Sequence, residues 1–219
     1  MNSNMQAILF DMDGLMIDTE SVSGQSWLLA AAEVGVTIPE QVILGMVGLS
    51  VHKCRDHVAA HFQDHKLAET LSQRCRHHYH QLMSTGELRL KPGIIEVLDW
   101  VQDQAIPHAV ATSTQRLMCD LKLQRSGLGP YFQHTVAGDE VANTKPAPDV
   151  YLAAAALLDI APAACVVLED SLIGMRAALV AGMRVILVPD MLQPAAHETA
   201  GALAVCQDLH QALLLLQTL

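Results

Sequence analysis

The segment Ala7-Ile8-Leu9-Phe10-Asp11-Met12-Asp13-Gly14 joins a short apolar run to two carboxylates one residue apart. The apolar run, which begins at residue 6, is typical of a strand buried on both faces. Both aspartates would then follow its carboxyl end, where α/β sheets bind ligands. Two carboxylates so placed can hold a cation while one attacks an electrophile. A simple Asx-type turn at Asp13-Gly14 is the alternative interpretation.

Further along the chain, short runs rich in Val, Ile and Leu alternate with helical patterns. The apolar runs cover residues 109–112, 135–137, 165–168 and 184–188. The helical patterns cover residues 94–104, 115–126, 149–158 and 172–181. This alternation predicts an α/β fold with a doubly wound parallel sheet, that is, a Rossmann-like core.

Residues 18–87 break the alternation. They contain no convincing strand pattern, and their composition indicates several helices separated near residues 35–39 and 45–50. We therefore expect an α/β core formed by residues 1–17 and 88–219, with an α-helical cap domain inserted as residues 18–87.

Composition narrows the classes of function. The 219 residues are 51% hydrophobic, enough for one sizeable core and a smaller unit. Asp and Glu outnumber Lys and Arg by 23 to 13, and no basic run is present, which argues against nucleic-acid binding. A small anionic substrate would need positive charge supplied locally, by a metal ion, a lysine or helix N-termini.

The five cysteines form no Cys-x-x-Cys pair, so we expect them to be reduced packing residues. The first residues lack a signal-peptide pattern, and no run of eighteen apolar residues follows. The expectation is a cytoplasmic protein without a membrane partner, either a monomer or a weak dimer.

Thr112-Ser113-Thr114 is a second polar cluster, at the end of a predicted strand and the start of a helix. Hydroxyl groups and unpaired amides at a helix start favour anion binding. Thr114 fits an ordinary N-cap, whereas Thr112 at the strand tip is the better ligand candidate.

Two more clusters follow. Pro146 restricts Lys145 to an extended conformation, which presents the ammonium from a stiff loop, although a solvated lysine is the simpler interpretation. Glu169-Asp170-Ser171 follows a strongly apolar strand and can complete a metal site, or Asp170 or Ser171 can cap the next helix. Four such clusters, all near carboxyl ends of parallel strands, are expected to converge.

These motifs resemble those of the haloacid dehalogenase (HAD) superfamily, in the branch with a helical cap that includes β-phosphoglucomutase and many small-molecule phosphatases. The resemblance covers nearly the whole chain. It is carried by Asp11-Met12-Asp13-Gly14 with Asp18-Thr19-Glu20, Thr112-Ser113, Lys145-Pro146-x-Pro148-Asp149-x-Tyr151 and Glu169-Asp170-Ser171-x-x-Gly174.

The resemblance implies a set of roles at the matching positions. Asp11 would be the nucleophile that forms an aspartyl-phosphate, and Asp13 would protonate the leaving oxygen and then activate water. Thr112, Ser113 and Lys145 would bind the phosphoryl oxygens, with Lys145 also steadying the nucleophile.

The resemblance also implies Mg²⁺ as the cofactor. The ion would be held by the Asp11 carboxylate, the Asp13 backbone carbonyl and Asp170, with Glu169 nearby. The substrate would be a small phosphorylated metabolite, with a sugar phosphate expected, and its choice would rest on the cap domain.

The reaction type follows from comparison within the family. Dehalogenases and phosphonate-cleaving relatives lack an aspartate at the position of Asp13, which argues against both chemistries. Mutases carry a histidine where this chain has Ser23 and an arginine where it has Val51, so hydrolysis is favoured. Lys53 or Arg55 could replace that arginine, which leaves a sugar phosphate mutase as the alternative. A non-catalytic phosphate-binding module is a third hypothesis.

Seven of the eleven histidines fall within residues 18–87. His57, His61 and His65 have a four-residue spacing, so on one helix they would share a face and could bind zinc or nickel. A solvated cap surface is the favoured interpretation.

Overall fold

A computed structural model describes residues 5–191 and 193–219. The chain divides into two compact units. The core unit consists of Met1–Ile17 together with Arg89–Leu219. The helical unit consists of Asp18–Leu88. Among the helices of the described residues, none combines the length and the apolar character needed to cross a bilayer.

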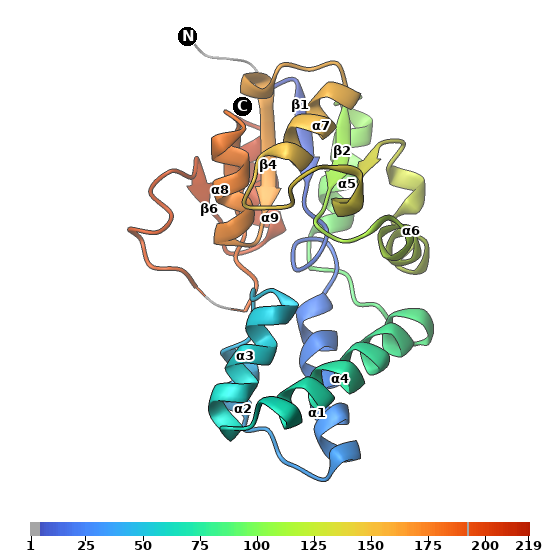
Figure 1. The fold of residues 1–219 in the computed structure, drawn as a ribbon. Coiled ribbons are helices and arrows are strands. Elements are labelled where there is room, and N and C mark those ends of the chain that lie inside the picture. Colours follow the sequence, from blue (N-terminus) through green and yellow to red (C-terminus); the bar gives the residue numbers. More distant parts are fainter. Residues whose placement is uncertain (1–4, 192) are drawn as a thin grey trace. The chain divides into compact units, whose positions relative to one another are not determined.

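The core unit is built on a six-stranded parallel sheet (Figure 1). Its strands are β1 (Ala7–Phe10), β2 (His108–Ala111), β3 (Thr135–Val136), β4 (Cys165–Glu169), β5 (Arg184–Leu187) and β6 (Ala204–Val205). They are ordered β3-β2-β1-β4-β5-β6, so β1 lies between β2 and β4. This arrangement confirms the predicted doubly wound parallel sheet. β6, which the sequence analysis did not predict, is only two residues long.

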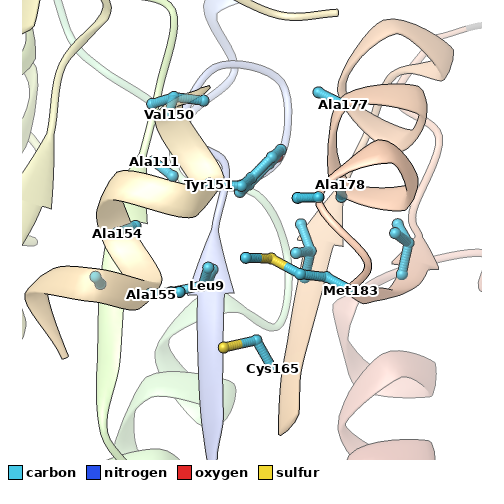
Figure 2. Close-up of a cluster of buried hydrophobic side chains, with 14 of the residues drawn as sticks. Leu9, Ala111, Val150, Tyr151, Ala154, Ala155, Cys165, Ala177, Ala178 and Met183 are labelled. Carbon is cyan, nitrogen blue, oxygen red and sulfur yellow. The ribbon is translucent and has the colours of Figure 1, made fainter. Parts of the chain in front are cut away.

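Helices α7 (Asp149–Leu157) and α8 (Leu172–Val180) cover one face of the sheet. Figure 2 shows Tyr151 of α7 and Ala178 of α8 directed toward the strands, with Leu9 of β1 beneath them. Alanines on both helices face the sheet, and their small size allows the helix backbones to approach it closely. This cluster fixes α7 and α8 relative to β1 and β4.

The remaining helices of the core unit are α5 (Ile94–Asp103), α6 (Arg116–Arg125) and α9 (Leu209–Leu216), with 3₁₀ turns at Gly129–Tyr131, Gly138–Glu140 and Pro162–Ala164. α5 and α9 pack against each other, and both lie behind the sheet in Figure 1. Four helices were expected in this unit, and each is found within one residue of its expected bounds. α9 is the helix that was not expected.

The helical unit contains α1 (Thr19–Val34), α2 (Glu40–Leu44), α3 (Val51–Phe62) and α4 (His65–Thr85). Its own hydrophobic core includes Trp27, Val58 and Leu71. α3 ends before residue 63, and His65 begins α4, so the three histidines do not share one helix, as the disfavoured zinc or nickel hypothesis required. Among the described residues, these histidines do not form a group able to share a metal ion.

Candidate active site

The carboxyl ends of three neighbouring strands carry the candidate residues. Asp11 follows β1, Thr112 follows β2, and Glu169 is the last residue of β4. Lys145 lies in the loop before α7, and the Lys145–Pro146 peptide bond is cis. Because β1 pairs with both β2 and β4, side chains distant in the sequence meet at one edge of the sheet.

Lys145 lies between two carboxylates. Its ammonium forms an ion pair with Asp11 and donates a hydrogen bond to Glu169 Oε1 at 2.7 Å. Its side chain is only 5% exposed, and the side chains of Asp11 and Glu169 are 9% and 1% exposed. Burial opposes the charge of Lys145, but Asp11 and Glu169 outweigh it and raise the pKa of the ammonium above its usual value. Lys145 is therefore charged and fixed in place.

Glu169 is held by three donors besides Lys145. The Tyr151 hydroxyl donates to Oε1 at 2.7 Å, and the backbone N–H and hydroxyl of Ser171 each donate to Oε2 at 3.0 Å. Burial acts to raise the pKa of Glu169, but Lys145 and these hydrogen bonds lower it below its usual value. Ser171 also caps α8 by accepting from Gly174 N, so Ser171, and not Asp170, is the cap of this helix.

Asp11, Glu169 and Asp170 form an acidic cluster in which one carboxylate oxygen from each residue lies within 4.8 Å of the other two. Burial is the main reason that the pKa of Asp11 rises to about 7, since it outweighs the opposing effect of Lys145. Burial, followed by the charges of Glu169 and Asp11, also raises the pKa of Asp170 well above its usual value. Oxygen donors with excess negative charge suit a hard divalent cation such as Mg²⁺, so the residues fit the expected metal.

Gly14 lies against the acidic cluster, and its lack of a side chain leaves space for Asp170. Its φ is +83°, and a Cβ atom there would lie 2.2 Å from Asp170 Oδ2. Asp190 extends the cluster on this side, because the same Cβ position is 3.6 Å from Asp190 Oδ2. Lys91 pairs with the other oxygen of Asp190, while Oδ2 is buried with no hydrogen-bond partner among the described residues. Any side chain at position 14 would therefore displace Asp170.

Asp13 is held by a separate set of residues. Thr114 Oγ1 donates to Asp13 Oδ2 at 2.7 Å, and Lys122 of α6 forms an ion pair with Oδ1. Thr112 Oγ1 is 3.5 Å from Asp13 Oδ2, at the limit of a hydrogen bond, and it accepts from Thr114 N at 3.1 Å. Thr114 is thus not the N-cap that the sequence analysis expected, and Gln115 occupies that position.

Ser113 is exposed in the loop between Thr112 and Thr114, with its side chain accessible to solvent. Its backbone packs tightly, since a Cβ on Gly138 would lie 2.2 Å from Ser113 O. The loop that carries the candidate phosphate-binding hydroxyls is therefore backed by the 3₁₀ turn that begins at Gly138.

Arg116 binds the acidic pair Asp139-Glu140. Arg116 forms ion pairs with Glu140 at 2.6 Å and with Asp120 at 2.9 Å, and its backbone N–H donates to Asp139 at 2.8 Å. The Arg116–Asp120 pair spans one turn of α6. Asp139 and Glu140 thus stabilise the start of α6.

Sequence reasoning missed Lys122 and Asp190. Lys122 carries a weak signal, since it follows buried Cys119 by three residues and precedes buried Leu123, on the face of α6 that is directed inward. A lysine on that face has to find a buried partner. Asp190 has no comparable signal, because it lies beyond the end of β5 in irregular chain.

Comparison with known proteins extends these observations to the family. Residues 8–188 match the family model described as haloacid dehalogenase-like hydrolase. Protein CbbY of Rhodobacter capsulatus is 33% identical over 195 residues, which cover 84% of this chain and 86% of that protein. The phosphorylated carbohydrates phosphatase of Thermotoga maritima is 31% identical over 203 residues, which cover 92% of this chain and 94% of that protein.

A crystal structure from Thermotoga maritima, assigned as a β-phosphoglucomutase, has the same fold. The match covers 98% of this chain and 100% of that chain, with a TM-score of 0.82 and 29% sequence identity. Sequence and structure therefore agree on the assignment. The chain belongs to the haloacid dehalogenase-like hydrolases.

Proposed function

We propose that this protein is a Mg²⁺-dependent phosphatase that hydrolyses a small phosphate monoester, with sugar phosphates as the substrate class. The observation that carries the proposal is the pairing of Asp11 with Lys145 beside Glu169 and Asp170, at the carboxyl end of β1. This arrangement combines a fixed nucleophile, a fixed cation and a group of metal-binding oxygens. The name of the Thermotoga maritima relative, a phosphorylated carbohydrates phosphatase, supports the substrate class.

Asp11 supplies the nucleophile in the first step. One of its carboxylate oxygens attacks phosphorus, the bond from phosphorus to the leaving oxygen breaks, and the Asp13 carboxyl group gives its proton to that oxygen. In the second step, Asp13 accepts a proton from water, whose oxygen attacks phosphorus, and the bond from phosphorus to the Asp11 oxygen breaks, which regenerates the Asp11 carboxylate. Inorganic phosphate is released, and both carboxyl groups return to their starting states.

Positive charge at the site stabilises the transferring phosphoryl group. Lys145 and the hydroxyls of Thr112 and Ser113 would bind its oxygens. The Asp11 and Asp170 carboxylates and the Asp13 backbone carbonyl would hold Mg²⁺, with Glu169 nearby. When bound, Mg²⁺ would offset the crowded negative charge of these carboxylates and of the phosphoryl oxygens.

Substrate selection is assigned to the helical unit, since the polar groups gathered in the core unit are those that phosphoryl transfer requires. On this assignment, relatives with the same core residues and different helical units act on different esters. The core unit would then determine the reaction, and Asp18–Leu88 would determine the substrate.

A sugar phosphate mutase is the second candidate, and the β-phosphoglucomutase assignment of the Thermotoga maritima structure favours it. Ser23 and Val51 argue against it, because they replace the residues expected to hold a bisphosphate intermediate. Conversion of a hexose 1-phosphate into its 6-phosphate, without release of inorganic phosphate, would establish the mutase.

The test is release of inorganic phosphate from a panel of phosphorylated metabolites by the purified protein with Mg²⁺. We expect turnover of at least one sugar phosphate, and Asp11→Asn should abolish it while leaving the fold intact. Asp120→Asn is the matched control, because that exposed carboxylate pairs with Arg116 outside the site. Binding without turnover would favour the non-catalytic module, and an active Asp11→Asn variant would exclude Asp11 as the nucleophile.

A further inference from the structure

We propose that Lys122 and Thr114 are positioning residues that fix the orientation of the Asp13 carboxyl group during proton transfer. The inference rests on the proposed phosphatase function, because it assigns a task to two residues that surround the proposed acid and base. Neither residue is needed to bind the phosphoryl group or the metal ion in the steps described above.

The contacts form a closed triangle around Asp13. Lys122 Nζ pairs with Oδ1, Thr114 Oγ1 donates to Oδ2 at 2.7 Å, and Lys122 Nζ is 3.5 Å from Thr114 Oγ1. Because Lys122 contacts one carboxylate oxygen and Thr114 the other, rotation of the carboxyl group about its own axis would break both contacts. The triangle therefore sets the plane of the carboxyl group as well as its position.

Exposure differs sharply within this triangle. The Lys122 side chain is 3% exposed, whereas that of Asp13 is 29% exposed. The lysine thus approaches from the protein interior, and the carboxyl group keeps an open side that substrate and water can reach. A reactive carboxyl group that is fixed on its buried side and open to substrate on the other side is expected to have this pattern of exposure.

Stability alone gives a weak reason for this ion pair. Burying an ammonium carries a desolvation cost that its partner only partly offsets, and apolar replacements of buried pairs are often neutral or stabilising. A methionine at position 122 would fill much of the same space without that cost. Proper placement of Asp13 gives a reason for a charged residue at this position.

The two catalytic carboxyl groups have different cations. Lys145 holds Asp11 from the loop before α7, and Lys122 holds Asp13 from α6. The nucleophile and the acid are therefore oriented by independent parts of the core unit. Loss of Lys122 should disturb proton transfer and leave the attack by Asp11 largely intact.

The contacts also assign the atom that carries the proton. An ammonium only donates, so Oδ1 must remain an acceptor toward Lys122. A hydroxyl both donates and accepts, so Thr114 can stay bonded to Oδ2 whether or not that oxygen is protonated. Oδ2 is thus the oxygen that gives its proton to the leaving group in the first step and accepts one from water in the second.

The leaving group provides the test. Departure of 2,4-dinitrophenolate needs no proton, whereas departure of phenolate from phenyl phosphate is helped by one. The value of kcat/KM reports the steps up to leaving-group departure, so the ratio of the two kcat/KM values isolates the acid. For Lys122→Met, we expect kcat/KM for phenyl phosphate to fall about tenfold more than that for 2,4-dinitrophenyl phosphate.

Three further variants sharpen this test. Thr114→Val removes the contact to Oδ2 in a side chain of similar shape, and it should move the ratio in the same direction. Lys122→Arg keeps the charge and should restore the ratio in part. Lys91→Met removes a lysine that pairs with Asp190, so it serves as the matched control and should leave the ratio unchanged.

Each outcome is decisive. If the wild type is active but Lys122→Met lowers both kcat/KM values equally or not at all, Lys122 does not position the acid. If Lys122→Met does not fold, an unchanged ratio in Thr114→Val overturns the inference in its place. A wild type that turns over neither of these esters nor any sugar phosphate of the panel would overturn the proposed function, and this inference with it.

Discussion

Tyr151 donates a hydrogen bond to Glu169 across 2.7 Å, and this contact joins the hydrophobic core to the candidate site. The Tyr151 ring is completely buried in the cluster beneath α7 and α8 (Figure 2). The ammonium of Lys145 lies 4.6 Å from the centre of the ring. One side chain therefore anchors both the lysine and the glutamate of the site.

Replacement of Tyr151 by phenylalanine should lower stability without changing the packing. The variant Tyr151→Phe removes one of the donors to a buried carboxylate, at a cost of about 1 kcal/mol or more in the free energy of unfolding. Chemical denaturation measures this difference. Tyr131→Phe is the control, because it removes an exposed hydrogen bond to Asp99 and should cost less. Equal losses in the two variants would contradict the anchoring role of Tyr151.

Gly174, which lies against the Glu169 carboxylate, should not tolerate a methyl group. A Cβ atom at this position would lie 1.5 Å from Glu169 Oε1, so Gly174→Ala has to displace the carboxylate from Lys145 and Tyr151. We expect a loss of stability of about 1–3 kcal/mol together with a loss of activity. In Gly129→Ala the nearest atom to the new Cβ is 3.7 Å away, so this control should be almost neutral. Thermal unfolding and phosphate release measure both effects.

Lys145 should be needed for both stability and activity. Lys145→Met leaves the buried carboxylates of Asp11 and Glu169 without their shared cation, and breaking such a buried pair typically costs about 3–5 kcal/mol. We expect lost turnover and a lower unfolding midpoint. Added Mg²⁺ should recover part of the stability, since it supplies positive charge to the same cluster. A variant as stable as the wild type would show that the three groups are not charged together.

Much of the site was predictable because apolar runs and polar clusters meet at strand ends. The pattern at 165–168 was followed by Glu169 and Asp170, and the structure indeed ends β4 at Glu169 and places both residues in the acidic cluster. Parallel strands bring their carboxyl ends to one edge, so strand patterns alone predict that such clusters converge. Asp11, Lys145, Glu169 and Asp170 were found in this way.

Other features depend on interactions that a local pattern does not contain. Thr114 has the residue type and the place of an N-cap, but its hydroxyl bonds to Asp13, which is distant in the sequence. The pattern of α6 places Lys122 on the inward face but does not identify its partner, because Asp13 lies in the loop after β1, distant in the sequence. The four-residue histidine spacing is compatible with one helix, yet Gln63 adopts a φ of +53° and ends α3 two residues before His65.

The raised pKa values of the buried Asp11 and Asp170 carboxyl groups make the free energy of unfolding depend on pH. The pKa of Asp11 is about 7 in the folded protein, against an ordinary value of 3.8, because burial disfavours its charged form. Between these two values the folded state binds more protons than the unfolded state, so the free energy of unfolding falls as the pH rises from about 4 through about 7. Asp170, whose pKa is raised mainly by burial, acts in the same direction.

Mg²⁺ should reverse this trend, because it binds the deprotonated carboxylates and competes with protons. We expect Mg²⁺ to raise the melting temperature more at pH 8 than at pH 5, by about 2–4 °C for each kcal/mol of added stabilisation. Calorimetry with EDTA and with Mg²⁺ at both pH values measures the difference. Asp11→Asn is the control, since the metal-free variant should lose part of the decline between pH 4 and pH 7. An equal effect of Mg²⁺ at both pH values would mean that the ion binds away from Asp11 and Asp170.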